Sequence, residues 1–190
     1  RIGQRDNTLI IYLGDNGSPR EVCDIRHPQL GEICGGKGHT NDRGTHVPLI
    51  CNWPGAIPPS IVVEDLIDNT DYLPTIMEAA GIQFPPGYIL DGRSFYPQLT
   101  GEKGNPRDWI FFHFEPMNAH RFAANPEKRI STHEIQRFIR DHRWKLYEDG
   151  RLFDLTTDLE EEEAWFEEDD NDLRAAARKI LEPVFGQMVK

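Results

Sequence analysis

Three polar side chains that could bind an oxyanion lie in two short glycine-rich segments. Asp15 and Asn16 directly follow an apolar run and precede a glycine. Their carboxylate and amide oxygens are hard ligands of the kind that Ca²⁺ and Mg²⁺ prefer. Lys37 is flanked by glycines, and backbone N–H groups in such loops form anion-binding nests. A divalent cation and a lysine ammonium at one place would form a site for an oxyanion.

Each of these features also has a plainer interpretation. Adjacent Asp and Asn residues are common in tight turns, because both side chains hydrogen-bond to local backbone. A lysine framed by glycines is equally compatible with a flexible surface loop. His39 could donate a proton near the same anion or be an ordinary loop histidine. Two oxygen ligands cannot complete a calcium shell of about six to eight oxygens, so other ligands must come from elsewhere.

The first half of the chain predicts the elements that would position these side chains. Residues 9–13 are a short apolar run ended by turn residues, which predicts a buried strand, and residues 46–53 predict a second one. In open α/β sheets, ligands bind just past the carboxyl ends of such strands. Residues 18–45 form a long polar connection of a length that is usually functional. A helix follows, with Leu73, Ile76, Met77 and Ala80 on its apolar face.

The second half predicts a small antiparallel meander and a final helix. Its strands are expected at residues 109–114, 138–140, 144–147 and 152–155. Asp149 and Gly150 predict a tight type I′ turn before the last of them. The final helix begins near Asn171, and Pro183 is expected to kink or end it. The chain therefore divides into an α/β part, residues 1–105, and a small α+β part, residues 106–190.

Composition excludes several functional classes. The formal net charge of -11 argues against partners such as nucleic acid or an anionic membrane surface. Nine of the thirteen residues at 160–172 are Asp or Glu, and this acidic run predicts a solvated surface segment. No apolar run reaches the length of a membrane helix, and no signal peptide is visible. Three cysteines without a C-x-x-C pair argue against a zinc site, and the count is compatible with one disulfide such as Cys23–Cys34.

Taken together, several segments resemble the sulfatase family, in the family's order and over most of the chain. They are Asp15-Asn16-Gly17, Gly36-Lys37-Gly38-His39-Thr40, Gly44-Thr45-His46-Val47-Pro48, Trp53-Pro54-Gly55, Asp71-Tyr72-Leu73-Pro74-Thr75, Asp91-Gly92-Arg93-Ser94, Leu99-Thr100-Gly101, Trp144-Lys145-Leu146-Tyr147 and Leu152-Phe153-Asp154-Leu155. The resemblance implies an α/β fold, the C-terminal part of an alkaline-phosphatase-like sheet-and-helix domain. A small antiparallel β-meander and a C-terminal helix would follow it.

The resemblance also implies an activity and roles for named residues. Sulfatases hydrolyse sulfate esters with a divalent metal, usually Ca²⁺, with Mg²⁺ as the alternative. The family's metal-binding pair carries over to Asp15 and Asn16, and its sulfate-binding lysine carries over to Lys37, with His39 as a further catalytic candidate. His120 and Arg121 are candidates for a wall of the substrate pocket. The substrate would be an aryl or carbohydrate sulfate, and the location extracellular or periplasmic.

One departure from the family is large. Sulfatases use a formylglycine nucleophile made from Cys or Ser in a C/S-x-P-x-R motif, and no Cys or Ser of this chain fits it. The family's N-terminal pair of Asp metal ligands is absent as well. We therefore expect a C-terminal portion that is inactive alone and that could self-associate through an exposed cut face. The alternatives are a phosphodiesterase or phosphonate hydrolase of the same superfamily, or a non-catalytic module that binds sulfated glycans.

Overall fold

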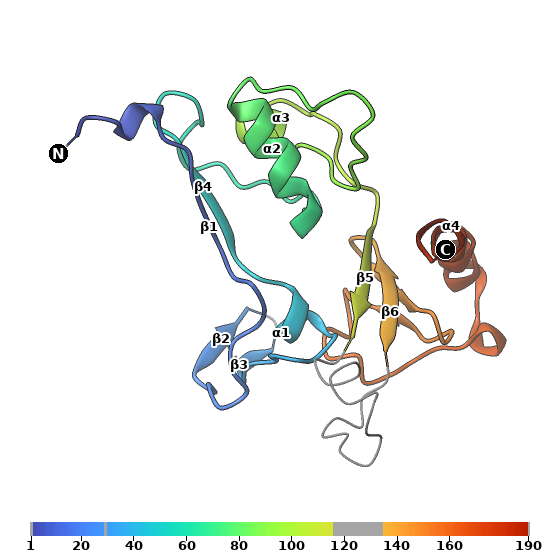
Figure 1. The fold of residues 1–190 in the computed structure, drawn as a ribbon. Helices are drawn as coiled ribbons and strands as arrows, with labels where there is room; N and C mark the ends of the chain where they lie inside the picture. The colour runs from blue at the N-terminus through green and yellow to red at the C-terminus, as the bar shows by residue number, and fades with distance from the viewer. Residues whose placement is uncertain (1, 29, 116–134, 190) are drawn as a thin grey trace, which may run out of the picture. The chain divides into compact units, whose positions relative to one another are not determined.

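The computed structural model describes residues 2–28, 30–115 and 135–189 (Figure 1). The chain forms two compact units, each built from segments that are not contiguous in sequence. The first unit comprises Arg1–Leu13 and Pro48–Ile110, and the second comprises Gly14–Val47 and Phe111–Lys190. The division predicted from the sequence, at residues 105 and 106, stays a prediction.

The first unit contains a two-stranded antiparallel sheet and several short helices. Its elements are η1 (Arg5–Asn7), β1 (Ile10–Leu13), β4 (Leu49–Asn52), η2 (Asn69–Asp71), α2 (Tyr72–Ala79) and α3 (Tyr96–Leu99). Strand β1 pairs with β4 so that Ile10 faces Asn52 and Leu13 faces Leu49. Both predicted strands are therefore present, but they are not buried: Tyr12 is 61% exposed and Ile50 is 60% exposed.

Helix α2 is present where the sequence predicts a helix, but two residues of its predicted apolar face are exposed, Leu73 at 46% and Ile76 at 48%. Asp68 accepts a hydrogen bond from the Thr70 N–H at 2.9 Å, and the Asp71 carboxylate accepts one from the Asp68 N–H at 2.8 Å. This reciprocal capping belongs to η2, the short helix that leads directly into α2, and it satisfies N–H groups that have no partner inside η2. Asp71 is buried, and Arg107 holds its carboxylate with Nε 2.7 Å from Oδ2. A paired aspartate thus anchors this unit, a role that the sequence analysis did not assign.

The second unit is built on a four-stranded antiparallel sheet. Its elements are β2 (Ile25–His27), β3 (Gly31–Ile33), α1 (Asp42–Thr45), β5 (Ile110–Phe114), β6 (Gln136–Arg140), β7 (Trp144–Tyr147), β8 (Leu152–Asp154), η4 (Glu167–Asp169) and α4 (Asp172–Met188). The sheet order is β5-β6-β7-β8, as the predicted meander requires. The polar connection at residues 18–45 contains the β2–β3 hairpin and α1, and a Cys23–Cys34 disulfide closes the hairpin segment.

The core of the second unit lies within this sheet and beneath α4. Phe138 stacks on Phe112 with ring centroids 4.9 Å apart, and Tyr147 meets Phe153 edge-on at 5.8 Å. Helix α4 packs on β6 and β7 and buries an apolar stripe. The buried apolar residues of the sheet and helix are Phe138, Ile139, Leu146, Leu152, Phe153, Ala177, Leu181 and Val184. All residues of β7 and β8 are buried, so these strands are covered on both faces.

One local prediction for the second unit was wrong. Tyr147 and Arg151 close a loop of three residues, in which Gly150 has φ +93° while Asp149 has no positive φ. A type I′ turn would need positive φ at both central residues, so the turn is not of that type. Helix α4 is capped by the predicted Asn171 and continues through Pro183 to Met188, so Pro183 does not end the helix, and a kink at Pro183 stays a prediction. In the described ranges, no helix has the length and apolar character that a bilayer crossing requires.

Candidate anion and metal site

The turn that carries Asp15 and Asn16 is packed tightly against helix α1. The N–H of Gly17 donates to the carbonyl oxygen of Gly44 at 2.9 Å. A Cβ placed on Gly17 would lie 1.9 Å from the carbonyl oxygen of Arg43, which no side chain could tolerate. Glycine is therefore required at this position because the backbone of α1 comes so close.

The loop that carries Lys37 is packed against the same helix. The N–H of Lys37 donates to the carbonyl oxygen of Ser18 at 3.0 Å, and the N–H of His39 donates to that of Gly36 at 2.8 Å. A Cβ on Gly36 would lie 2.4 Å from the Cβ of Arg43. The two glycine-rich segments therefore meet on the same residues of α1, so that the Asp15 turn and the Lys37 loop are neighbours.

The side chains at this place have the chemistry of a partial cation and anion site. Asp15 and Lys37 are exposed, and no described residue forms a hydrogen bond or ion pair with either side-chain charge. Asn16 is half-buried, and its amide nitrogen donates to the carbonyl oxygen of Gly17 at 2.9 Å, which leaves its side-chain oxygen available as a ligand. His39 is half-buried and has a partner within the molecule.

The donor set fits part of a divalent-cation site. A carboxylate and an amide oxygen on one turn supply two of the six to eight oxygens that calcium takes. Across residues 2–28, 30–115 and 135–189, no three His, Cys, Asp or Glu side chains come together in a metal-binding group. His120 and Arg121, the candidates for a substrate wall, lie outside the described residues.

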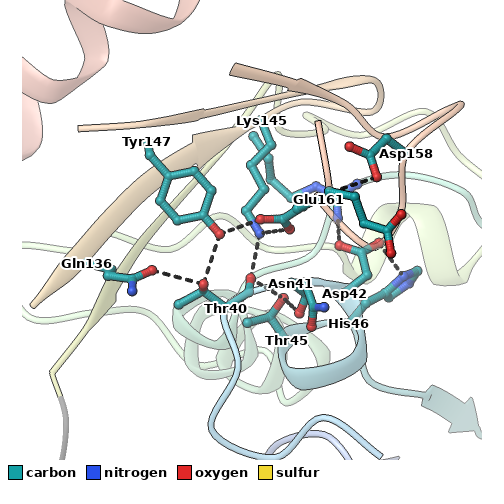
Figure 2. Close-up of polar contacts among 12 residues, drawn as sticks. Thr40, Asn41, Asp42, Thr45, His46, Gln136, Lys145, Tyr147, Asp158 and Glu161 are labelled. Atoms are coloured by element: carbon teal, nitrogen blue, oxygen red, sulfur yellow. Dashed lines mark hydrogen bonds and ion pairs between the residues drawn. The ribbon is translucent and has the colours of Figure 1, made fainter. Parts of the chain in front are cut away.

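A buried polar cluster lies immediately beyond the Lys37 loop (Figure 2). The ammonium of Lys145, on β7, donates to the carbonyl oxygen of Thr40 and lies 2.6 Å from Oε1 of Glu161. The Tyr147 hydroxyl lies 2.5 Å from Oε2 of Glu161 and 2.9 Å from Oγ1 of Thr40. The Thr40 hydroxyl in turn donates to Gln136 at 3.1 Å. This Thr40 cluster, formed by these five residues, ties the loop to the sheet.

Burial dominates the electrostatics of the Thr40 cluster. Lys145 is 0% exposed, and burial lowers the pKa of its ammonium although the neighbouring Glu161 carboxylate raises it. Its ammonium also lies 3.9 Å from the ring centroid of Phe138, a cation–π contact. Burial and the Glu161 charge both raise the pKa of Tyr147, so its phenol stays protonated. The cluster therefore contains one buried ion pair and a neutral phenol donor.

Two further ion pairs hold α1 against the same sheet and its following loop. Asp42 Oδ1 lies 2.8 Å from Nη1 of Arg140, and Arg43 Nη2 lies 2.7 Å from Oε2 of Glu160. Burial raises the pKa of Asp42, but its hydrogen bond with His46 and the nearby positive charges outweigh that and lower it to about 2. Helix α1, on which both glycine-rich segments rest, is thus fixed by charged contacts.

The Thr40 cluster was not predicted from the sequence, because the acidic run was interpreted as solvated surface. That prediction was wrong for three of its members: Glu161 is 7% exposed on its side chain, Glu160 pairs with Arg43, and Asp170 pairs with the buried Arg178. One sequence signal could have revealed the cluster. The lysine of β7 stands between apolar residues in a segment that predicts a buried strand, so its charge would need a partner. A buried lysine needs a carboxylate partner, and the acidic run, which follows the meander in sequence, offers several carboxylates.

Comparisons with known proteins give the fold its context. A family model described as "N-sulphoglucosamine sulphohydrolase, C-terminal" matches residues 37–184. The ulvan-active sulfatase of Formosa agariphila is 33% identical over 142 residues, which are 74% of this chain and 23% of that protein. The chain spans about a fifth of the length of the first curated relatives that it matches.

Solved structures extend the match to nearly the whole chain. A protein in complex with its substrate, D-glucosamine-2-N,6-O-disulfate, has a TM-score of 0.71 at 21% identity, covering 98% of this chain and 35% of that one. The phosphonate monoester hydrolase of Silicibacter pomeroyi has a TM-score of 0.62 at 28% identity, again covering 98% of this chain and 35% of that one. These similarities confirm the predicted fold class for a C-terminal portion of the alkaline-phosphatase-like type.

Proposed function

Because this chain belongs to the family of N-sulphoglucosamine sulphohydrolase C-terminal regions, we propose that it supplies part of the metal and sulfate site of a sulfuric ester hydrolase. The observation that carries the proposal is the meeting of the Asp15 turn and the Lys37 loop on Arg43 and Gly44 of α1. That packing makes the backbones of the two segments neighbours and so supports a shared site for two oxygen donors and one ammonium, and both charged side chains are exposed.

Each residue in this proposal has a distinct role. Asp15 and Asn16 would hold a divalent cation, Ca²⁺ or Mg²⁺, and the rest of its shell would come from other oxygens. Lys37 would bind the sulfate group, and its ammonium would stabilise negative charge on the sulfuryl oxygens as the ester bond breaks. When bound, the cation supplies Lewis-acid stabilisation of the same oxygens. His39 is the candidate proton donor at this site, and His120 and Arg121 remain candidates for contact with the rest of the substrate.

The substrate class in this proposal is a sulfate ester, aryl or carbohydrate. The matched relatives support it by name, since one acts on ulvan and one solved structure holds a disulfated glucosamine as its substrate. An extracellular or periplasmic location belongs to the same proposal. The Cys23–Cys34 disulfide supports it, because disulfides persist in oxidising compartments.

Calorimetric titration of the full 190-residue chain tests the proposed site. In 5 mM CaCl₂ (about the level needed to fill a weak site), p-nitrophenyl sulfate should bind, and EDTA should remove binding. Lys37→Ala should weaken binding by about tenfold, the usual order for loss of one charged contact to an anion. Lys179→Ala is the matched control, because it removes an exposed lysine of α4 and should leave the affinity unchanged.

The outcomes of this experiment separate the candidate functions. Equal binding by the parent chain and Lys37→Ala would contradict the proposed sulfate site. Because no residue fits the nucleophile motif, the chain alone should not release p-nitrophenol, and clear turnover would contradict that part of the proposal. Binding of a sulfated disaccharide that persists in EDTA would instead favour the non-catalytic glycan-binding module.

A phosphonate or phosphodiester hydrolase of the same superfamily is the second candidate function. The specific observation in its favour is the 28% identity to a phosphonate monoester hydrolase over 98% of this chain. The titration should therefore be repeated with p-nitrophenyl phenylphosphonate. Tighter binding of the phosphonate ester than of the sulfate ester would favour this second function.

A further inference from the structure

The loop that carries Lys37 is fastened at its C-terminal end by strand β7. Two polar groups of Thr40 are engaged there, the carbonyl oxygen by the Lys145 ammonium and the hydroxyl by Tyr147. Figure 2 shows both side chains pointing from β7 toward Thr40, with Glu161 between them. Thr40 follows Lys37 by three positions, so these contacts act on the backbone next to the candidate anion site.

The opposite end of the loop is fastened independently. The Lys37 N–H bonds to Ser18, and the close approach of Gly36 to Arg43 leaves no room for a side chain. The Lys37 side chain therefore projects from a short stretch of backbone that is held on both sides. Release of Thr40 would free one side only, so the expected result is a loosened loop within a folded unit.

Glu161 adopts an uncommon backbone conformation. Its φ is +61°, in the left-handed region that non-glycine residues rarely adopt. In this conformation its two carboxylate oxygens reach Lys145 and Tyr147 simultaneously. A buried ion pair contributes little net stability compared with apolar side chains of similar volume. Apolar residues at these positions could therefore fill the same space, but they could not form hydrogen bonds with Thr40.

We infer that Lys145, Tyr147 and Glu161 are positioning residues for the anion-binding loop, acting on Lys37 through Thr40. The inference rests on the proposed function, which gives Lys37 a sulfate group to bind. By holding Thr40, the Thr40 cluster orients the loop before the ligand arrives, so that binding does not have to order it. The meander and the acidic run that follows it thereby support the proposed anion site at Lys37.

A matched pair of substitutions at Thr40 tests the inference in the full chain. Thr40→Val keeps the shape and removes the hydroxyl, whereas Thr40→Ser keeps the hydroxyl. In Thr40→Val, the affinity for p-nitrophenyl sulfate with CaCl₂ should fall about tenfold, as expected for a displaced binding group. Amide exchange at Lys37 and His39 should quicken by about the same factor, while the Leu146 amide of β7 stays protected. Thr40→Ser should match the parent chain within about twofold.

A second variant keeps the inference falsifiable if Thr40→Val does not fold. The pair Lys145→Met with Glu161→Met removes both charges and replaces them with flexible apolar side chains, so it should fold while losing the same affinity. If Lys37→Ala abolishes binding while folded Thr40→Val and the double variant bind like the parent chain, the positioning role is overturned and the proposed function survives. If Lys37→Ala has no effect, the proposed function fails, and quickened exchange at Lys37 in Thr40→Val would still support the anchoring.

Discussion

Strands β1 and β7 have the same length but opposite surroundings. All four residues of β7 are buried, whereas three of the four residues of β1 are exposed. Strand β7 has a neighbour on each edge, and α4 packs on it, but β1 pairs only with β4. Both strands are rich in apolar residues, and β7 even contains a lysine. The difference teaches that an apolar run predicts a strand, while burial depends on what covers its faces.

The largest effect that would test this comparison comes from the buried lysine of β7. Lys145→Met removes one partner of the ion pair and leaves the Glu161 carboxylate buried without its counter-charge. The second unit should lose about 3–5 kcal/mol of unfolding free energy, measured by circular dichroism in urea. Lys103→Met, at an exposed lysine of the first unit, should change stability by less than about 0.5 kcal/mol. A loss below about 1 kcal/mol in Lys145→Met would show that the pair is not buried as described.

Prediction from the sequence succeeded for elements with a local pattern and failed for contacts between distant residues. The strands of the meander and the start of α4 were predicted well, because short apolar runs bounded by turn residues and helix-capping residues are local signals. The family resemblance led us to expect that the Asp15 turn and the Lys37 loop lie together. The physical cause of this arrangement, the contacts of their glycines with α1, was not expected. Glu161 could not be found by local reasoning, because its partner Lys145 lies sixteen positions earlier in sequence and on another element. Ion pairs between distant residues, and the elements that pack over a sheet, produce no periodic pattern in the local sequence.

Isoleucine truncation gives the next largest effect and compares the two sheets directly. Ile139 on β6 is 0% exposed and Ile50 on β4 is 60% exposed. Ile139→Ala should cost about 3 kcal/mol of unfolding free energy, because it leaves a cavity in a closed core. Ile50→Ala should cost less than about 0.5 kcal/mol, because little buried surface is lost. Chemical denaturation of both variants at the same pH measures the difference.

The same pair of variants addresses the predicted self-association through an exposed cut face, for which the exposed β1–β4 sheet is a candidate. If copies of this chain associate through β1 and β4, Ile50→Ala should weaken the association seen in sedimentation velocity, and Ile139→Ala should not. Equal destabilisation by the two truncations would mean that the exposed face of β4 is covered in solution. That result would remove the contrast between the sheets on which the comparison rests.

The smallest of these effects depends on pH and concerns the ion pair between α1 and the buried sheet. The pKa of Asp42 is lowered from 3.8 to about 2, so its ionised form stabilises the folded state above about pH 4. As pH falls from about 4 toward 2, the folded state takes up this proton less readily than the unfolded chain, and the stabilisation is lost. Asp42→Asn should therefore be less stable than the parent chain by about 2 kcal/mol at pH 6, and the two should converge at pH 2. Urea unfolding at intervals between pH 2 and pH 6 measures this difference, and a gap that stays constant over the range would show that Arg140 and His46 do not favour the Asp42 carboxylate in the folded unit.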